Sequence, residues 1–173
     1  MIDPTVFIAR GAIVLGDVDL GKDVNVWYNA VIRGDTDKIS IGAETNIQDL
    51  TMIHADPGTP CVVGNRVTVG HRVILHGCTI GDDCLIGMGA IVLNNVRVGR
   101  GSVIGAGAVL LEGTDVPPGS VVVGIPGRVK GHVDAAMIER LEHGWRHYVE
   151  KARRHRAGAY PARTSSPAAS SSA

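Results

Sequence analysis

The chain has 173 residues, with 17 basic and 17 acidic side chains and a formal net charge of zero. This balance gives no electrostatic reason to expect binding to nucleic acid or to a charged membrane surface. Two tryptophans, three tyrosines and one phenylalanine stand against 23 glycines, which favours a sheet-rich fold with many tight turns.

The length fits a single domain, and no apolar stretch is long enough to span a membrane. The first residues lack the basic segment and clean apolar run of a secretory signal. Three cysteines cannot all pair with one another, and no CxxC spacing occurs. We therefore expect a cytoplasmic protein with reduced thiols at Cys61, Cys78 and Cys84.

A repeat of six residues begins near the N-terminus, where insertions interrupt it. Extra residues follow Ile32 and Ile53, and loops that protrude from a repeated coil commonly gather on a functional side. The aliphatic positions of this first part are Leu15, Leu20, Val26, Ile32, Ile41, Ile47 and Ile53.

From residue 63 to residue 120 the repeat is nearly regular. An amphipathic helix would show spacings of three and four, and antiparallel hairpins would need longer units. The aliphatic positions, with a single five-residue step, are Val63, Val69, Leu75, Ile80, Ile86, Val92, Val98, Ile104, Leu110 and Val116. The fifth place of each unit is small or β-branched, and is held by Val67, Val73, Thr79, Cys84, Ala90, Val96, Ser102, Ala108, Thr114 and Ser120.

Six residues fit one short strand and a corner, so three units, or 18 residues, make one triangular coil. Successive coils would stack at about 4.8 Å, the distance between neighbouring strands of a sheet, with the aliphatic side chains inside. The pattern predicts an all-β domain over residues 1–131, a parallel β-helix with the shape of a triangular prism. The spacing does not fix the handedness of the coil.

Residues 132–156 change to a helical pattern. The segment places Ile138, Leu141, Trp145, Tyr148, Val149 and Ala152 on one stripe, so we predict an α-helix packed along the prism. Asp134 is a candidate N-cap. The histidines of this region, His132, His143, His147 and His155, are expected in solvent. Residues 157–173 have the composition of a disordered tail.

The remaining histidines fall at related places in the repeat. His54 follows Ile53 and His76 follows Leu75, 22 residues later, which equals one coil plus a four-residue insertion. The two side chains should therefore stack on neighbouring coils, close enough to share an ion with Zn–N distances of about 2.0–2.1 Å. Arg33 should join the same column. His71 lies on another face, and a neighbouring subunit of a three-fold assembly would bring it to the site.

Three histidines with an open fourth position are typical of catalytic zinc sites. With these residues in view, the sequence resembles the gamma-class carbonic anhydrases. The resemblance rests on "RGDTDKISIGAETNIQDLTMIH", "VTVGHRVILHGCTIGDDCLIGMGAIVL", "IGAGAVL" and "GIPGRV", and it covers about residues 5 to 130. It implies a left-handed parallel β-helix of hexapeptide repeats and a homotrimer with Zn²⁺ (Fe²⁺ or Co²⁺ in some members) between subunits.

The resemblance also implies roles for individual residues. His54 and His76 would bind the metal from one subunit and His71 from the next. Gln48 would hydrogen-bond the metal-bound hydroxide or the substrate, with Asn46 in the supporting network. The remaining two residues, Arg33 and Asp35, would form an ion pair between subunits; a purely structural role for this pair, and a turn role for Asn46, stay open.

The implied reaction is the hydration of carbon dioxide to bicarbonate by metal-bound hydroxide. The best-known members carry a glutamate proton shuttle in an acidic loop, and this chain has Thr36, Asp37 and Asp56 in the corresponding loops. The shuttle therefore stays open between Asp56, buffer and a water chain. The alternatives are a hexapeptide acyltransferase with one histidine as base, a CoA-thioester hydrolase, and a weakly active or non-catalytic scaffold.

Overall fold

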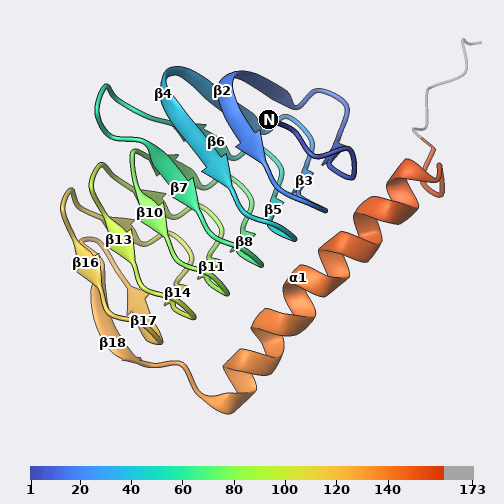
Figure 1. Ribbon diagram of the computed structural model, residues 1–173. Helices are drawn as coiled ribbons and strands as arrows, with labels where there is room; N and C mark the ends of the chain where they lie inside the picture. The colour runs from blue at the N-terminus through green and yellow to red at the C-terminus, as the bar shows by residue number, and fades with distance from the viewer. Residues whose placement is uncertain (162–173) are drawn as a thin grey trace, which may run out of the picture.

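The computed structural model describes residues 1–161, which form a parallel β-solenoid followed by one long helix (Figure 1). The predicted β-helix of hexapeptide repeats and the predicted C-terminal helix are confirmed. The elements are β1 (Phe7–Ile8), β2 (Ile13–Leu20), β3 (Asn25–Val26), β4 (Val31–Ile41), β5 (Asn46–Ile47), β6 (Met52–His54), β7 (Cys61–Val63), β8 (Thr68–Val69), β9 (Ile74–His76), β10 (Thr79–Ile80), β11 (Leu85–Ile86), β12 (Ile91–Val92), β13 (Arg97–Val98), β14 (Val103–Ile104), β15 (Val109–Leu110), β16 (Asp115–Val116), β17 (Ser120–Val123), β18 (Arg128–His132) and α1 (Ala135–Arg156).

The solenoid has three faces. Face A contains the first parts of β2 and β4, then β6, β9, β12 and β15; face B contains β1, β3, β5, β8, β11, β14 and β17. Face C contains the last parts of β2 and β4, then β7, β10, β13 and β16. The long strand β4 turns the corner between faces A and C, which joins them into one continuous sheet.

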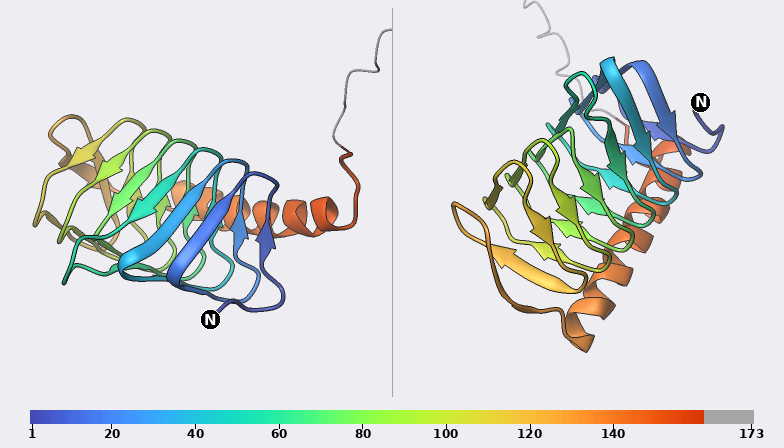
Figure 2. Two further views of the ribbon diagram at one scale, coloured as in Figure 1. Left: turned by 90° about the horizontal axis from the view of Figure 1, so that it is seen from above. Right: turned by 60° about the vertical axis from the view of Figure 1, so that its left-hand side comes forward.

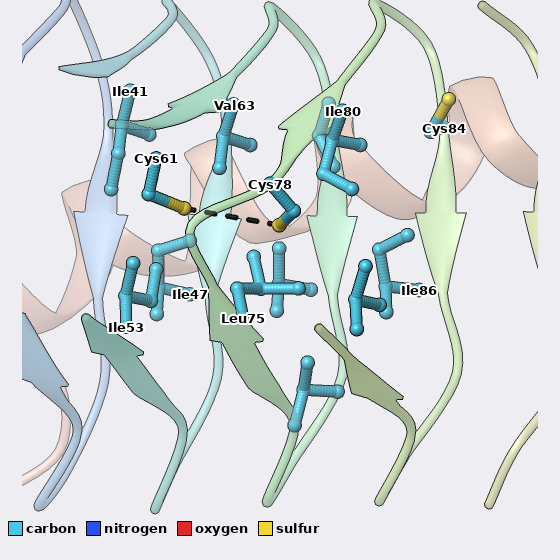
Figure 3. Packing of buried hydrophobic residues seen from close by; sticks show 14 of the residues in the cluster. Ile41, Ile47, Ile53, Cys61, Val63, Leu75, Cys78, Ile80, Cys84 and Ile86 are labelled. Atoms are coloured by element: carbon cyan, nitrogen blue, oxygen red, sulfur yellow. Dashed lines mark hydrogen bonds between the residues drawn. The ribbon is translucent and has the colours of Figure 1, made fainter. Parts of the chain in front are cut away.

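The core lies inside the prism, where the aliphatic residue of each coil stacks on the next (Figure 3). All ten aliphatic residues predicted from Val63 to Val116 are buried. Cys61 and Cys78 face each other in this core, with 3.9 Å between their sulfur atoms. Burial also raises the pKa of the Cys84 thiol to about 11, which keeps this cysteine protonated and unreactive.

Two predicted core positions were wrong. Thr79 is exposed and Cys78 takes the inward place, because the five-residue step shifts the small position to the residue two before Ile80. In the first coil, Leu15 is 41% exposed and Val14 packs against the core instead. The pairing of Val14 with the buried Ile32 explains the inward direction of Val14, since paired residues of neighbouring parallel strands share a face.

Helix α1 runs back along the solenoid from the last coil to the first (Figures 1 and 2). Asp134 is its N-cap, and the carboxylate accepts a hydrogen bond from the Met137 amide at 2.8 Å. The predicted start at residue 132 was three residues early, because His132 still pairs with Ser120 in the antiparallel strand β18. Within residues 1–161, no helix is both long and apolar enough to cross a membrane.

The second half of α1 packs on face B, against β1, β3, β5 and β8, and buries Val149 and Ala152. The first half also buries Leu141, but it borders a cavity of about 490 Å³. Ile138 of the predicted apolar stripe, which lines this cavity, is 51% exposed. The predicted tail of residues 157–173 lies outside the described residues from position 162 onward.

Candidate metal centre

His54 and His76 occupy the last positions of β6 and β9, directly opposite each other in the register of face A. Their side chains therefore leave the same side of the sheet on neighbouring coils, at the corner where face A meets face C. The Nδ1 atom of His54 lies 3.1 Å from the Nε2 atom of His76. The predicted stacking of these two residues is confirmed.

This separation fits two ligands of one ion. In a tetrahedral site with Zn–N distances of 2.0–2.1 Å, the two nitrogen atoms lie about 3.3 Å apart. Imidazole nitrogens are suitable donors for Zn²⁺, Fe²⁺ and Co²⁺. The donor set and its spacing in this structure therefore fit the metal that the sequence predicts.

Asp35 and Arg33 lie beside this pair, on β4. The Arg33 guanidinium donates to both carboxylate oxygens of Asp35 at 2.7 Å and holds the pKa of Asp35 below its ordinary value. The ionised Asp35 lies 3.1 Å from Nε2 of His54. From the sequence, we expected the Arg33–Asp35 pair between subunits. Within one chain the two side chains pair with each other, because residues two apart on a strand point to the same side; a pair between subunits stays a prediction.

His71 lies at the opposite end of face A, in the turn between β8 and β9. Its Nδ1 atom is 2.9 Å from a carboxylate oxygen of Asp49. His76 is the last residue of β9, whereas His71 precedes the start of that strand, so the two histidines lie at opposite ends of face A within one chain. Accordingly, the described residues 1–161 contain no group of three or more potential metal ligands.

Asn46 and Gln48 lie on face B, which meets face A at the corner of His71 and not at the corner of His54 and His76. Both side chains are buried: the Gln48 amide donates to Asn46 Oδ1 at 3.0 Å, and the Asn46 amide donates to Thr68 Oγ1 at 2.9 Å. Face B ends at the turn that carries His71, so Gln48 lies beside the Asp49–His71 pair. One chain does not bring Asn46 and Gln48 to the stacked histidine pair.

Three further residues contact the histidines directly or through one neighbour. Asp49 and Asn94 were not predicted from the sequence, and Asp56 was predicted only as a candidate proton shuttle. Asp49 accompanies His71, Asn94 lies 2.8 Å from Nδ1 of His76, and Asp56 accepts a hydrogen bond from Asn94 at 2.8 Å. A signal for Asn94 was present, because it follows His76 by 18 residues, the length of one coil. A signal for Asp49 was also present, because it precedes His71 by 22 residues, the same spacing that separates His54 from His76.

Two other predictions concern residues near or outside the centre. Cys78 points into the core with Cys61, away from the surface on which His76 lies. His155 was expected in solvent, and this was wrong: its ring lies among Phe7, Trp27 and Tyr160. The aromatic rings of the first coil and of α1 attract this histidine because they bury its apolar edge.

The cavity of about 490 Å³ lies apart from the histidines. It is lined on the helix side by Ile138, Leu141 and Trp145 and on the solenoid side by Arg66, Asp83 and Arg100. These solenoid residues belong to the corner between faces C and B, which the histidine pair does not share. The cavity and the stacked histidines therefore lie at different corners of the solenoid.

A repeated solenoid with paired histidines at one corner defines a class of hexapeptide-repeat protein. A family model described as bacterial transferase hexapeptide (six repeats) matches residues 77–112. The structure also resembles that of a hexapeptide transferase family protein from Anaplasma phagocytophilum, with 39% identity and a TM-score of 0.85 over 88% of this chain and 90% of the other.

Curated relatives narrow the assignment. A Methanocaldococcus jannaschii protein described as a probable carbonic anhydrase is 49% identical over 150 residues, which cover 87% of this chain and 94% of the relative. A carbonic anhydrase of Geobacillus kaustophilus is 43% identical over 156 residues, which cover 90% and 86% of the two chains. The chain belongs to the gamma carbonic anhydrase family.

Proposed function

We propose that this protein hydrates carbon dioxide reversibly to bicarbonate at metal sites shared between the subunits of a homotrimer. The observation that carries the proposal is the pair of ring nitrogens of His54 and His76 at 3.1 Å, the spacing of two ligands on one ion. His71, oriented by Asp49, would supply the third ligand from the next subunit.

Face A supports the trimer because its outward side chains form an apolar ladder. Ile13 and Ile74 of this ladder are 50% and 38% exposed, and an exposed contiguous apolar surface commonly marks a protein interface. The ladder consists of Ile13, Val31, Met52, Ile74, Ile91 and Val109. The corresponding ladder on face C is mostly polar: Asp19, Ser40, Val62, Thr79, Arg97 and Asp115.

Three-fold symmetry then explains how the site is completed. If the three copies of face A surround the symmetry axis, they form the sides of a central triangle and bury their apolar ladders there. Each strand of face A runs from the corner of His71 to the corner of His54 and His76. At every vertex of the triangle, the His54–His76 pair of one subunit meets His71 of the next.

The protein's own residues would orient the ligands and the reacting water. A bound divalent metal would lower the pKa of its bound water from 15.7 to about 7. Asp35 would hold the proton of His54 at Nε2, and Asp49 would hold the proton of His71 at Nδ1, which leaves the other nitrogen of each ring free to bind. Because the Gln48 amide donates to Asn46, its Oε1 atom is left to accept a hydrogen bond from water.

Acyl transfer is a second candidate, because the chain shares its fold at 39% identity with a hexapeptide transferase family protein. Such an enzyme would need one histidine as a general base and no metal. Metal content separates the two proposals: about one bound Zn²⁺, Fe²⁺ or Co²⁺ per chain supports hydration, and a metal-free active enzyme supports transfer.

Mixed trimers test the shared site directly. We expect His71→Ala and His76→Ala each to abolish metal binding and carbon dioxide hydration in stopped-flow assays. Co-expression of the two variants at equal levels should restore about one quarter of the sites, since an intact site requires one particular variant on each side of the interface.

Two outcomes would contradict the proposal. Full metal content in His71→Ala would show that the metal is held within one chain. Mixed trimers with no more metal than either variant alone would show that the two mutated positions do not belong to complementary halves of one site.

A further inference from the structure

We propose that Asn94, oriented by Asp56, fixes the tautomer of His76 and so presents its Nε2 atom to the metal. Asn94 would then be a positioning residue, because it acts through His76 and does not itself contact the metal. This inference rests on the proposed function and assigns a role to two residues beside the expected ligands.

The hydrogen-bond donors and acceptors around Asn94 determine which way its amide points. The Asn94 amide nitrogen donates to Asp56 Oδ2 at 2.8 Å, and an ionised carboxylate can only accept. The amide is therefore oriented with its Oδ1 atom toward Nδ1 of His76, at 2.8 Å. Since this oxygen also only accepts, the proton of the neutral His76 ring is on Nδ1, and Nε2 keeps its lone pair.

The other ring of the pair is fixed in the complementary way. Asp35 accepts from Nε2 of His54 at 3.1 Å, so Nδ1 of the neutral His54 ring also keeps its lone pair. The two lone-pair nitrogens face each other at 3.1 Å. Neither can donate to the other, and a shared cation satisfies both. Asp35 and Asn94 thus have the same role: each accepts a hydrogen bond from the ring nitrogen that faces away from the other histidine.

The backbone makes room for this arrangement at Gly77. This glycine has a φ of +53°, and a Cβ atom added to it would lie 2.3 Å from Asn94 Oδ1 and 2.8 Å from Thr59 Oγ1. A larger residue would displace the amide that contacts His76, and it would also be strained in this conformation. The close approach of Asn94 to His76 therefore depends on glycine at position 77.

The first test reads the tautomer in the metal-free protein. Imidazole ¹⁵N chemical shifts of a histidine-labelled chain, assigned by comparison with His76→Gln, should show the proton of His76 on Nδ1. Asn94→Ala should shift the population toward the form with the proton on Nε2. A parent protein with His76 protonated on Nε2, or an Asn94→Ala variant with an unchanged tautomer, would overturn the proposal.

The second test measures Co²⁺ affinity by competition with a chelator, together with the visible absorption spectrum of the bound Co²⁺. We expect Asn94→Ala to weaken binding about 10- to 100-fold, the usual effect of removing a partner behind a metal ligand. The exchange Asn94→Asp with Asp56→Asn should recover most of the affinity. In that double variant the amide at position 56 could donate to the carboxylate at position 94, which could in turn accept from His76.

Thr59→Ala is the matched control, since Thr59 donates to the Asp56 backbone carbonyl at 2.9 Å and makes no hydrogen bond to His76. It should leave both affinity and spectrum unchanged. Absence of Co²⁺ binding in the parent, with the Nδ1 tautomer intact, would refute the proposed function. Normal binding in both the parent and Asn94→Ala would refute only the role of Asn94.

Discussion

Each histidine of the candidate centre has one acceptor behind it. Asp35 lies 3.1 Å from His54, and Asp49 lies 2.9 Å from His71. Asn94 lies 2.8 Å from His76. Such partners fix the tautomer and direction of a ligating imidazole before the metal arrives. The three candidate ligands are therefore oriented histidines on two corners of the prism.

Asp49→Ala tests this orientation at a single residue. Without the carboxylate, the His71 ring should rotate more freely and populate both tautomers, so we expect metal affinity to fall about 10- to 100-fold. Chelator competition with Zn²⁺ would measure the change. Asp115→Ala, which removes an exposed carboxylate from face C, serves as the control. Equal affinities in the two variants would argue against a role for Asp49.

The sequence predicted the histidine pair but not the partners behind it. The register of His54 and His76 follows from the coil length, because the position of a residue along a repeated backbone depends only on spacing. The contact of Asp56 with Asn94 depends on side-chain rotamers and on the shape of the inserted loop, which spacing does not determine. The contact of Asp49 with His71 does follow the spacing, since these residues are 22 apart, as are His54 and His76.

At the scale of elements, ion pairs connect neighbouring coils along the corner between faces C and B. Asp83 lies between two arginines of neighbouring coils, and it accepts from Arg66 at 2.6 Å and from Arg100 at 3.0 Å. Burial raises the pKa of the Asp83 carboxyl, but the hydrogen bonds from the two guanidinium groups lower it by more, and the result lies below the ordinary value.

This lowered pKa predicts a pH dependence of stability. A carboxyl with a lower pKa in the folded state stabilises the fold above its unfolded-state pKa, near 3.9, and loses that contribution as the pH falls through its folded-state pKa. Denaturant unfolding between pH 7 and pH 2.5 should therefore show a weaker acid destabilisation in Asp83→Asn than in the parent. If the free energy of unfolding fell equally with pH in the parent and in Asp83→Asn, the stabilising role of ionised Asp83 would be contradicted.

The elements themselves differ in how far the sequence determined them. The regular coils from residue 63 onward were predictable because each inward residue repeats the environment of the residue one coil earlier. The inward residues of the first coil were less predictable, since Val14 packs inward where Leu15 was predicted. For α1, the N-cap at Asp134 was predictable. The exposure of Ile138 beside the cavity was not, since a helical pattern predicts which side of a helix is apolar and not how closely that side packs.

At the scale of the whole molecule, faces A and C offer a controlled test of assembly. Ile74→Asp places a charge in the apolar ladder of face A, where three copies would meet, so we expect the trimer to dissociate and metal binding to be lost. Thr79→Asp introduces the same charge at the corresponding outward place of face C, which we expect to stay in solvent. Sedimentation velocity would measure both.

The outcomes of this comparison are distinct. Dissociation only in Ile74→Asp would support face A as the contact surface. Trimers in both variants would place the interface elsewhere, and dissociation in both would point to a general loss of folding, which circular dichroism would reveal. Residue spacing alone predicts neither the interface nor the handedness of the coil, because either hand satisfies the same six-residue pattern.

The return of α1 to the first coil has a consequence for the order of folding during synthesis. The helix ends beside Asp23, which Arg153 contacts at 3.2 Å, and Arg156 donates to the Thr5 carbonyl at 2.8 Å. On the ribosome, the coils emerge in the order in which they stack, whereas the segment that shields the earliest of them emerges last. The first coils therefore lack the cover of α1 over Trp27 until translation of the described chain is almost finished.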